Sequence, residues 1–96
     1  MTNKRMPSHP GGILKRLYLD PLNLPVSDLA RALGVSRKTV SKVLNQRGSI
    51  TPEMALRLAI AFETTPQMWL NLQQNYDLWR AERRARGLKN VQKVAA

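Results

Sequence analysis

The stretch from residue 26 to residue 45 constrains the fold most strongly, because two short helical patterns meet there across Gly34 and Val35. A glycine at this place allows the left-handed backbone that ends a helix. Ser36 is then a good N-cap for the helix that follows. Apolar residues recur at helical spacing on both sides of the turn: Leu29, Leu33, Val35, Val40 and Val43. The pattern predicts two helices, over about 26–33 and 37–45, packed at a steep angle.

Three further helical segments flank this pair. Before it, apolar spacing predicts a helix that starts at Gly11 and ends at Asp20-Pro21, since a residue before proline avoids the helical region. After it, Thr51-Pro52-Glu53 and Thr65-Pro66 place a capping residue before a proline, which is typical of a helix start. The last helix is expected to run from residue 66 to about residue 86.

The length of the chain, 96 residues, allows one hydrophobic core. We therefore expect one all-α domain of five helices over residues 11–87. Residues 1–10, with Lys4 and Arg5, are expected to form a flexible arm, and residues 88–96 a frayed basic tail. His9, which precedes Pro10-Gly11, is expected to cap or pack against a helix rather than to act as a pH switch or a ligand.

The charge balance restricts the class of partner. Sixteen Lys and Arg residues against six Asp and Glu residues give a net charge of +10, which favours a polyanion, and nucleic acid over a membrane surface. With no cysteine and one histidine, a metal site, a cofactor or an enzymatic centre is not expected. The polar first ten residues do not have the pattern of a signal peptide, so we expect a cytoplasmic protein.

The helix over residues 37–45 carries the candidate binding residues. Its outward positions are polar, and the acidic residue types are missing from them. In a helix-turn-helix, the second helix enters the major groove of DNA and phosphate contacts set its register. We expect base or groove contacts from Arg37, Lys38, Thr39, Ser41 and Lys42, and phosphate contacts from Ser36, Asn45, Gln46 and Arg47. The plainer alternative is a helical hairpin whose charged face is only solvated.

Several segments resemble one known family. The five-helix pattern with Ala30, Gly34 and Val40 is similar to the XRE (lambda repressor-like) DNA-binding domain. Within that family, His9-Pro10-Gly11, the segment 50–59 (ITPEMALRLA) and the segment 69–78 (WLNLQQNYDL) resemble the HigA/VapI antitoxins, in the order and spacing of those proteins. The resemblance covers about residues 8–79.

What this resemblance implies is an antitoxin of a type II toxin–antitoxin pair. Such a protein binds a palindromic operator as a homodimer, represses its own operon and neutralises a RelE/HigB-like mRNA-cleaving toxin. The chain departs from antitoxins that carry a long acidic tail, because its last residues are few and basic. The alternatives are a stand-alone repressor without a toxin and a protein that coats DNA without regard to sequence.

The last helix presents the remaining candidates. Trp79 lies beyond the expected core and, with Tyr76, is our candidate for the dimer interface, although core packing is the default for Tyr76. Arg57 is expected to pair with Glu53 one turn earlier rather than to contact DNA. For Gln73, a hydrogen bond to another element and an exposed position are both open. A basic run near the end is either a solvated helix end or an auxiliary phosphate contact: Arg80, Arg83, Arg84, Arg86, Lys89 and Lys93.

Overall fold

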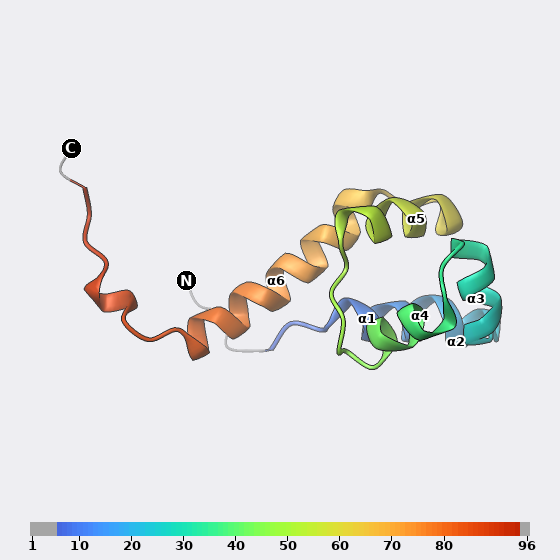
Figure 1. Ribbon diagram of the computed structural model, residues 1–96, viewed down its shortest axis with the longest axis horizontal. Helices are drawn as coiled ribbons and strands as arrows, with labels where there is room; N and C mark the ends of the chain where they lie inside the picture. Colours follow the sequence, from blue (N-terminus) through green and yellow to red (C-terminus); the bar gives the residue numbers. More distant parts are fainter. Residues whose placement is uncertain (1–5, 95–96) are drawn as a thin grey trace.

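The computed structural model describes residues 6–94, and this part of the chain contains helices and connecting segments without β-strands. The elements are α1 (Pro10–Leu14), a π-helical turn (Lys15–Leu19), α2 (Asp20–Leu22), α3 (Val26–Leu33), α4 (Arg37–Leu44), α5 (Pro52–Phe62), α6 (Pro66–Arg84) and a 3-10 turn (Leu88–Asn90). Because α1, the π-helical turn and α2 follow one another without a break, they form one helix, and the expected all-α fold of five helices is confirmed (Figure 1). Lys4 and Arg5, expected in a flexible arm, lie outside the described residues.

The first helix differs from the expectation at both ends. It begins at Pro10, and it continues through Pro21 to Leu22, where Asn23 adopts the left-handed conformation (φ 50°). Pro21 was expected to end the helix. The π-helical turn before it is wider than an α-turn, which leaves room for a ring that would clash with the carbonyl four residues earlier.

The two central helices meet as the sequence predicts. α3 ends at Gly34, whose φ of 72° is left-handed, and the Val35 N–H donates to the Ala30 carbonyl across the turn. α4 then begins after Ser36. Buried apolar residues on α3 and α4 hold the pair together, and α4 also packs against α1. An added Cβ at Gly11 in α1 would overlap the Val43 carbonyl, so a glycine is needed where these two helices approach.

The core is centred on Trp69 of α6, whose side chain is fully buried and whose indole N–H donates to the Thr64 hydroxyl (2.8 Å). The rings of Tyr18 and Phe62 pack beside it. The other central side chains are aliphatic and come from the helices around it and from the loop before α5: Leu14, Leu29, Leu33, Val40, Val43, Ile50, Met54 and Leu58. These contacts set the angle at which the pair α3 and α4 sits on the rest of the domain.

The last helix leaves the domain halfway along its length. Its buried residues are Trp69, Gln73 and Tyr76, and the last of them lies just past its midpoint. The second half and the segment that follows extend away from the other helices, and they account for the long axis of a molecule with extents of 52 × 25 × 22 Å (Figure 1). The apolar residues of this segment are exposed, including Leu88, Val91 and Val94.

Candidate nucleic-acid interface

Two buried valines fix which side of α4 faces the core, and the side that faces solvent is polar. Val40 and Val43 are buried, at 2% and 5% exposure. Successive residues of an α-helix are turned by about 100°, which places Lys38 and Lys42 opposite the valines. Arg37 lies at the edge of this face in the first turn. All three cations are exposed.

The first turn of α4 is held by its cap. The Ser36 hydroxyl accepts a hydrogen bond from the Thr39 N–H (3.1 Å), and the hydroxyls of Ser36 and Thr39 are 2.9 Å apart. This arrangement satisfies one of the free N–H groups at the helix start. Both side chains are exposed, and the positive end of the helix dipole lies beside them. The start of α4 is therefore a rigid, positively polarised end.

The other side of α4 borders a groove. Ser41 is half-buried, and together with Asn45 it lines a hollow of about 320 Å³ against the first helix and the start of α3. Lys15 and Asp20 form an ion pair (3.2 Å) at the same groove. Ser41 therefore lies on the flank of α4, whereas Asn45 remains exposed.

The loop after α4 folds back on the end of that helix. Gln46 adopts the left-handed conformation (φ 61°), and the N–H groups of Arg47 and Gly48 both donate to the Lys42 carbonyl (2.8 and 3.0 Å). Gln46 and Arg47 are exposed on this turn. The residues expected to contact phosphate therefore sit at both ends of α4, with Ser36 at its start and Asn45, Gln46 and Arg47 at its end.

The cations of α4 are not neutralised by the rest of the described chain. Ion pairs there join Lys15 to Asp20, Arg31 to Asp28 and Arg57 to Glu53, and none of them involves α4 or its flanking loops. The positive charge of this face is thus available to an anionic partner.

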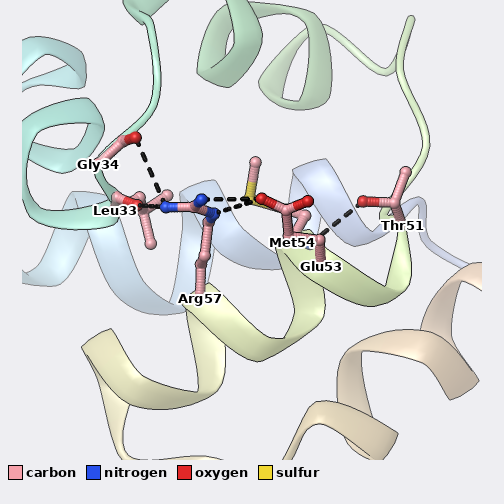
Figure 2. A network of polar contacts seen from close by, with 6 residues as sticks. All are labelled: Leu33, Gly34, Thr51, Glu53, Met54 and Arg57. Carbon is pink, nitrogen blue, oxygen red and sulfur yellow. Dashed lines mark hydrogen bonds and ion pairs between the residues drawn. The ribbon is translucent and has the colours of Figure 1, made fainter.

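The turn between α3 and α4 is braced from behind by Arg57 of α5 (Figure 2). Its guanidinium donates to the Leu33 carbonyl (2.8 Å) and, at 3.5 Å, to the Gly34 carbonyl. Glu53, one turn earlier, accepts from the same guanidinium at 2.8 and 3.2 Å. The expected pair of Glu53 with Arg57 is confirmed. The contact with the turn was not predicted, because it joins residues 24 positions apart and local spacing carries no signal for it.

His9 connects three elements beside this surface. Its Nδ1 accepts from the Gly11 N–H (2.9 Å) and so caps α1, while its ring lies edge-on to Tyr76 of α6, with centroids 4.8 Å apart. Burial, the largest effect, lowers the pKa of His9, against opposing effects of the Gly48 backbone and Asp77; nearby Arg80 lowers it further. The expectation that His9 caps and packs is confirmed, although Pro10 belongs to α1 and not to an arm.

The candidates on α6 occupy different environments. Tyr76 is buried in its own protomer at 9% exposure, so little of its ring is left for a second copy. Trp79 is half-buried beneath the Arg83 guanidinium, which lies 3.9 Å from the ring centroid. Its indole N–H is buried without a hydrogen-bond partner in the described structure. Gln73 accepts from the Ile50 N–H (2.8 Å), which ties the loop before α5 to α6.

Residues 6–94 contain no cluster of side chains that could hold a metal ion. In the same part of the chain, no helix is long and apolar enough to cross a membrane.

Two short helices, α3 and α4, joined by a tight turn, with an exposed basic face on the second helix, are typical of a helix-turn-helix DNA-binding protein. Comparison with known proteins agrees. The helix-turn-helix family model matches residues 14–69. Antitoxin HigA-1 of Vibrio cholerae is 43% identical over 76 residues, which are 79% of this chain and 71% of that protein. An uncharacterized HTH-type transcriptional regulator of Haemophilus influenzae is 46% identical over 90 residues (94% and 84%).

The solved structures point the same way. A structure titled antitoxin GraA in complex with its operator is 40% identical, with a TM-score of 0.88 over all of this chain and 99% of that one. The chain therefore belongs to the XRE-type helix-turn-helix family, together with the HigA antitoxins. The family comprises DNA-binding regulators and antitoxins, not enzymes.

Proposed function

We propose that this protein is the antitoxin of a type II toxin–antitoxin pair, which acts in the cytoplasm. It binds a palindromic operator as a homodimer, represses its own operon and neutralises a RelE/HigB-like mRNA-cleaving toxin. The observation that carries the DNA-binding part is the outward face of α4, where Arg37, Lys38 and Lys42 are exposed and unpaired in the described structure. The similarity to antitoxins that include one solved with its operator supports the rest.

The division of labour along α4 follows from exposure. Arg37 and Lys38 lie in the first turn, which is the part of a recognition helix that meets base edges, where a cation can donate to guanine. Lys42 and the hydroxyls of Thr39 and Ser41 reach the groove wall. The phosphate contacts come from Ser36 at one end of the helix and from Asn45, Gln46 and Arg47 at the other, and they set its register.

A homodimer would supply the second recognition helix that a palindrome requires. We place Trp79 at its interface, with Tyr76 packed behind it. Part of the Trp79 ring is exposed, and it lies on the segment of α6 that extends away from the other helices, where a second copy can cover it. Trp79→Glu is expected to shift the protein toward monomer in sedimentation and to weaken operator binding.

The toxin contact is expected to rely on apolar burial and local ion pairs, because a basic ribonuclease and a chain of charge +10 repel each other mildly. The first helix offers such a surface. Tyr18 turns inward to Phe62 and Trp69, whereas Leu17 is 62% exposed and Ile13 is half-buried. We place the toxin on Leu17 and its surroundings, and we expect the complex to tolerate salt far better than DNA binding does.

The test is co-expression with the product of the adjacent gene. An antitoxin forms a complex that survives purification and restores growth, and Leu17→Glu weakens that complex while Arg37→Ala leaves it intact. Absence of both a complex and growth rescue would contradict the antitoxin proposal.

A stand-alone transcriptional regulator is the second candidate. Its support is the similarity to the Haemophilus influenzae protein, which bears the name of an HTH-type regulator and covers more of this chain than HigA-1 does. A stand-alone regulator would bind DNA through the same face of α4 as an antitoxin does. Only co-expression with the product of the adjacent gene separates the two candidates.

A further inference from the structure

We infer that Arg57, which lies behind the DNA-binding surface, is a positioning residue for sequence reading by α4. The inference rests on the proposed role of α4 in DNA binding. It concerns a residue on α5 that belongs neither to the recognition helix nor to its flanking loops.

The contacts of Arg57 close the end of α3. The last carbonyls of a helix lack N–H partners within the helix and need another donor. Arg57 supplies one, with its Nη1 2.8 Å from the Leu33 oxygen and 3.5 Å from the Gly34 oxygen. These two residues form the turn that leads directly into Ser36 and α4, so the guanidinium holds the point from which α4 departs (Figure 2).

Glu53 keeps the guanidinium in place. Its Oε2 accepts from both Nε and Nη2 of Arg57, at 3.2 and 2.8 Å. One edge of the planar group, formed by Nε and Nη2, is thus bonded to Glu53 on α5, and Nη1 on the other side points to the turn. Glu53 is itself set in the first turn of α5, whose start is capped by the Thr51 hydroxyl through the Met54 N–H (3.1 Å). The contacts of Arg57 therefore hold the turn in a fixed orientation relative to α5. This helix packs directly on α3 and α6.

The guanidinium lies close against the turn, because a Cβ added to Gly34 would be 3.1 Å from the Arg57 Nη1. Base recognition by paired hydrogen bonds requires donors placed to within a fraction of an ångström. Phosphate attraction is far less sensitive to such shifts, because charge interactions fall off slowly with distance. Loss of Arg57 should therefore affect specific binding more than nonspecific binding.

The experiment measures two dissociation constants for each variant, one for a duplex selected by the wild type from a random pool and one for a scrambled duplex. Arg57→Gln is expected to lower the ratio of the two affinities about tenfold, the effect of one hydrogen bond to a charged group. Arg57→Lys should recover part of the ratio, since an ammonium can reach the Leu33 carbonyl but cannot also hold Glu53 by a fork.

Arg31→Gln is the matched control. It also removes one positive charge and one ion pair, with Asp28 (3.3 Å). The Arg31 side chain is exposed on α3, and only its backbone carbonyl, which the substitution keeps, bonds to the turn by accepting from the Gly34 N–H (3.2 Å). Its affinity ratio should equal that of the wild type.

A role in stability alone would give a different result, because a smaller folded fraction weakens both affinities equally and leaves their ratio unchanged. That outcome, or an equal loss in Arg31→Gln, would overturn the inference. If Arg57→Gln does not fold, Glu53→Ala decides, since it keeps Arg57 but frees it; an unchanged ratio there is equally contradictory. A wild type that does not distinguish the two duplexes would instead refute the proposed function of α4.

Discussion

The protein has two basic surfaces, the outward face of α4 and the second half of α6, and they are built in different ways. α4 is held by buried valines on one side, by Ser36 at its start and by the turn that Arg57 braces. Beyond Tyr76, α6 carries an equally dense set of cations, but this segment has no fully buried residue, and after the half-buried Trp79 and Arg80 it extends away from the other helices.

The difference teaches what each surface can contribute to recognition. Charge alone attracts a polyanion regardless of its sequence. To distinguish one base pair from another, donors must be held in place before the DNA arrives. The backbone that carries the α4 cations is held in this way, whereas the second half of α6 is not, so under the proposed function α6 would add attraction without selectivity.

The largest expected effect is on packing. Leu29 of α3 is fully buried beneath α4, and Leu29→Ala should reduce the free energy of unfolding by about 2–5 kcal/mol. The same change at Leu78, which is 54% exposed on α6, should alter it by less than about 0.5 kcal/mol. Denaturant titration of both variants measures the contrast. Equal losses would mean that the second half of α6 is packed as firmly as α3.

A smaller effect is expected at two glycines with left-handed backbone. Gly34, with a φ of 72°, lies in the turn before α4, and Gly34→Ala should cost about 1–2 kcal/mol. Gly87 has a similar φ of 83° but lies after α6, outside the packed helices. Gly87→Ala should therefore leave the thermal midpoint almost unchanged. A comparable drop in both variants would show that the segment after α6 unfolds together with the domain.

The smallest effect is a pH dependence at the junction of the two surfaces, where His9 touches Tyr76. Neutral His9 accepts the Gly11 N–H, and its pKa is lowered below 6.5, mainly by burial, with Asp77, Arg80 and the Gly48 backbone as the nearby groups. Protonation therefore favours the unfolded chain. The stabilisation is complete above pH 6.5 and is lost as the pH falls through the lower pKa of the folded state.

Denaturant titrations between pH 7 and pH 5 should show this decline in the wild type. His9→Asn provides the control, because asparagine can cap a helix but does not titrate, and the chain has no other histidine. A decline that persists in His9→Asn would assign the pH dependence to other groups.

The parts of the fold that the sequence predicts well are those with local signals. Ser36, Thr51 and Thr65 each cap the helix that follows them, as their positions before α4, α5 and α6 indicate. Gly34 takes the predicted left-handed conformation. Such features depend on a few adjacent residues and therefore appear in the sequence itself.

The parts that it predicts poorly depend on contacts between distant segments. Pro21 does not end the first helix, because a π-helical turn widens the backbone just before it. The reach of Arg57 to the turn is fixed by the packing of α5 on α3, and the bond from the Ile50 N–H to Gln73 depends on that of α5 on α6. None of these follows from residue type or spacing. On α4 the identity of the outward residues was predictable, but the half-buried flank position of Ser41 was not.

The central claim, that α4 reads base pairs and the second half of α6 does not, is tested most directly by selecting duplexes from a random pool with four proteins. These are the wild type, Arg37→Ala, Lys38→Ala and Arg83→Ala. We predict that each α4 variant loses preference at one base pair per half-site, with a loss of about 1–3 kcal/mol in operator affinity. Arg83→Ala should select the same sequence as the wild type. An unchanged selected sequence in both α4 variants, or a changed one in Arg83→Ala, would contradict the account.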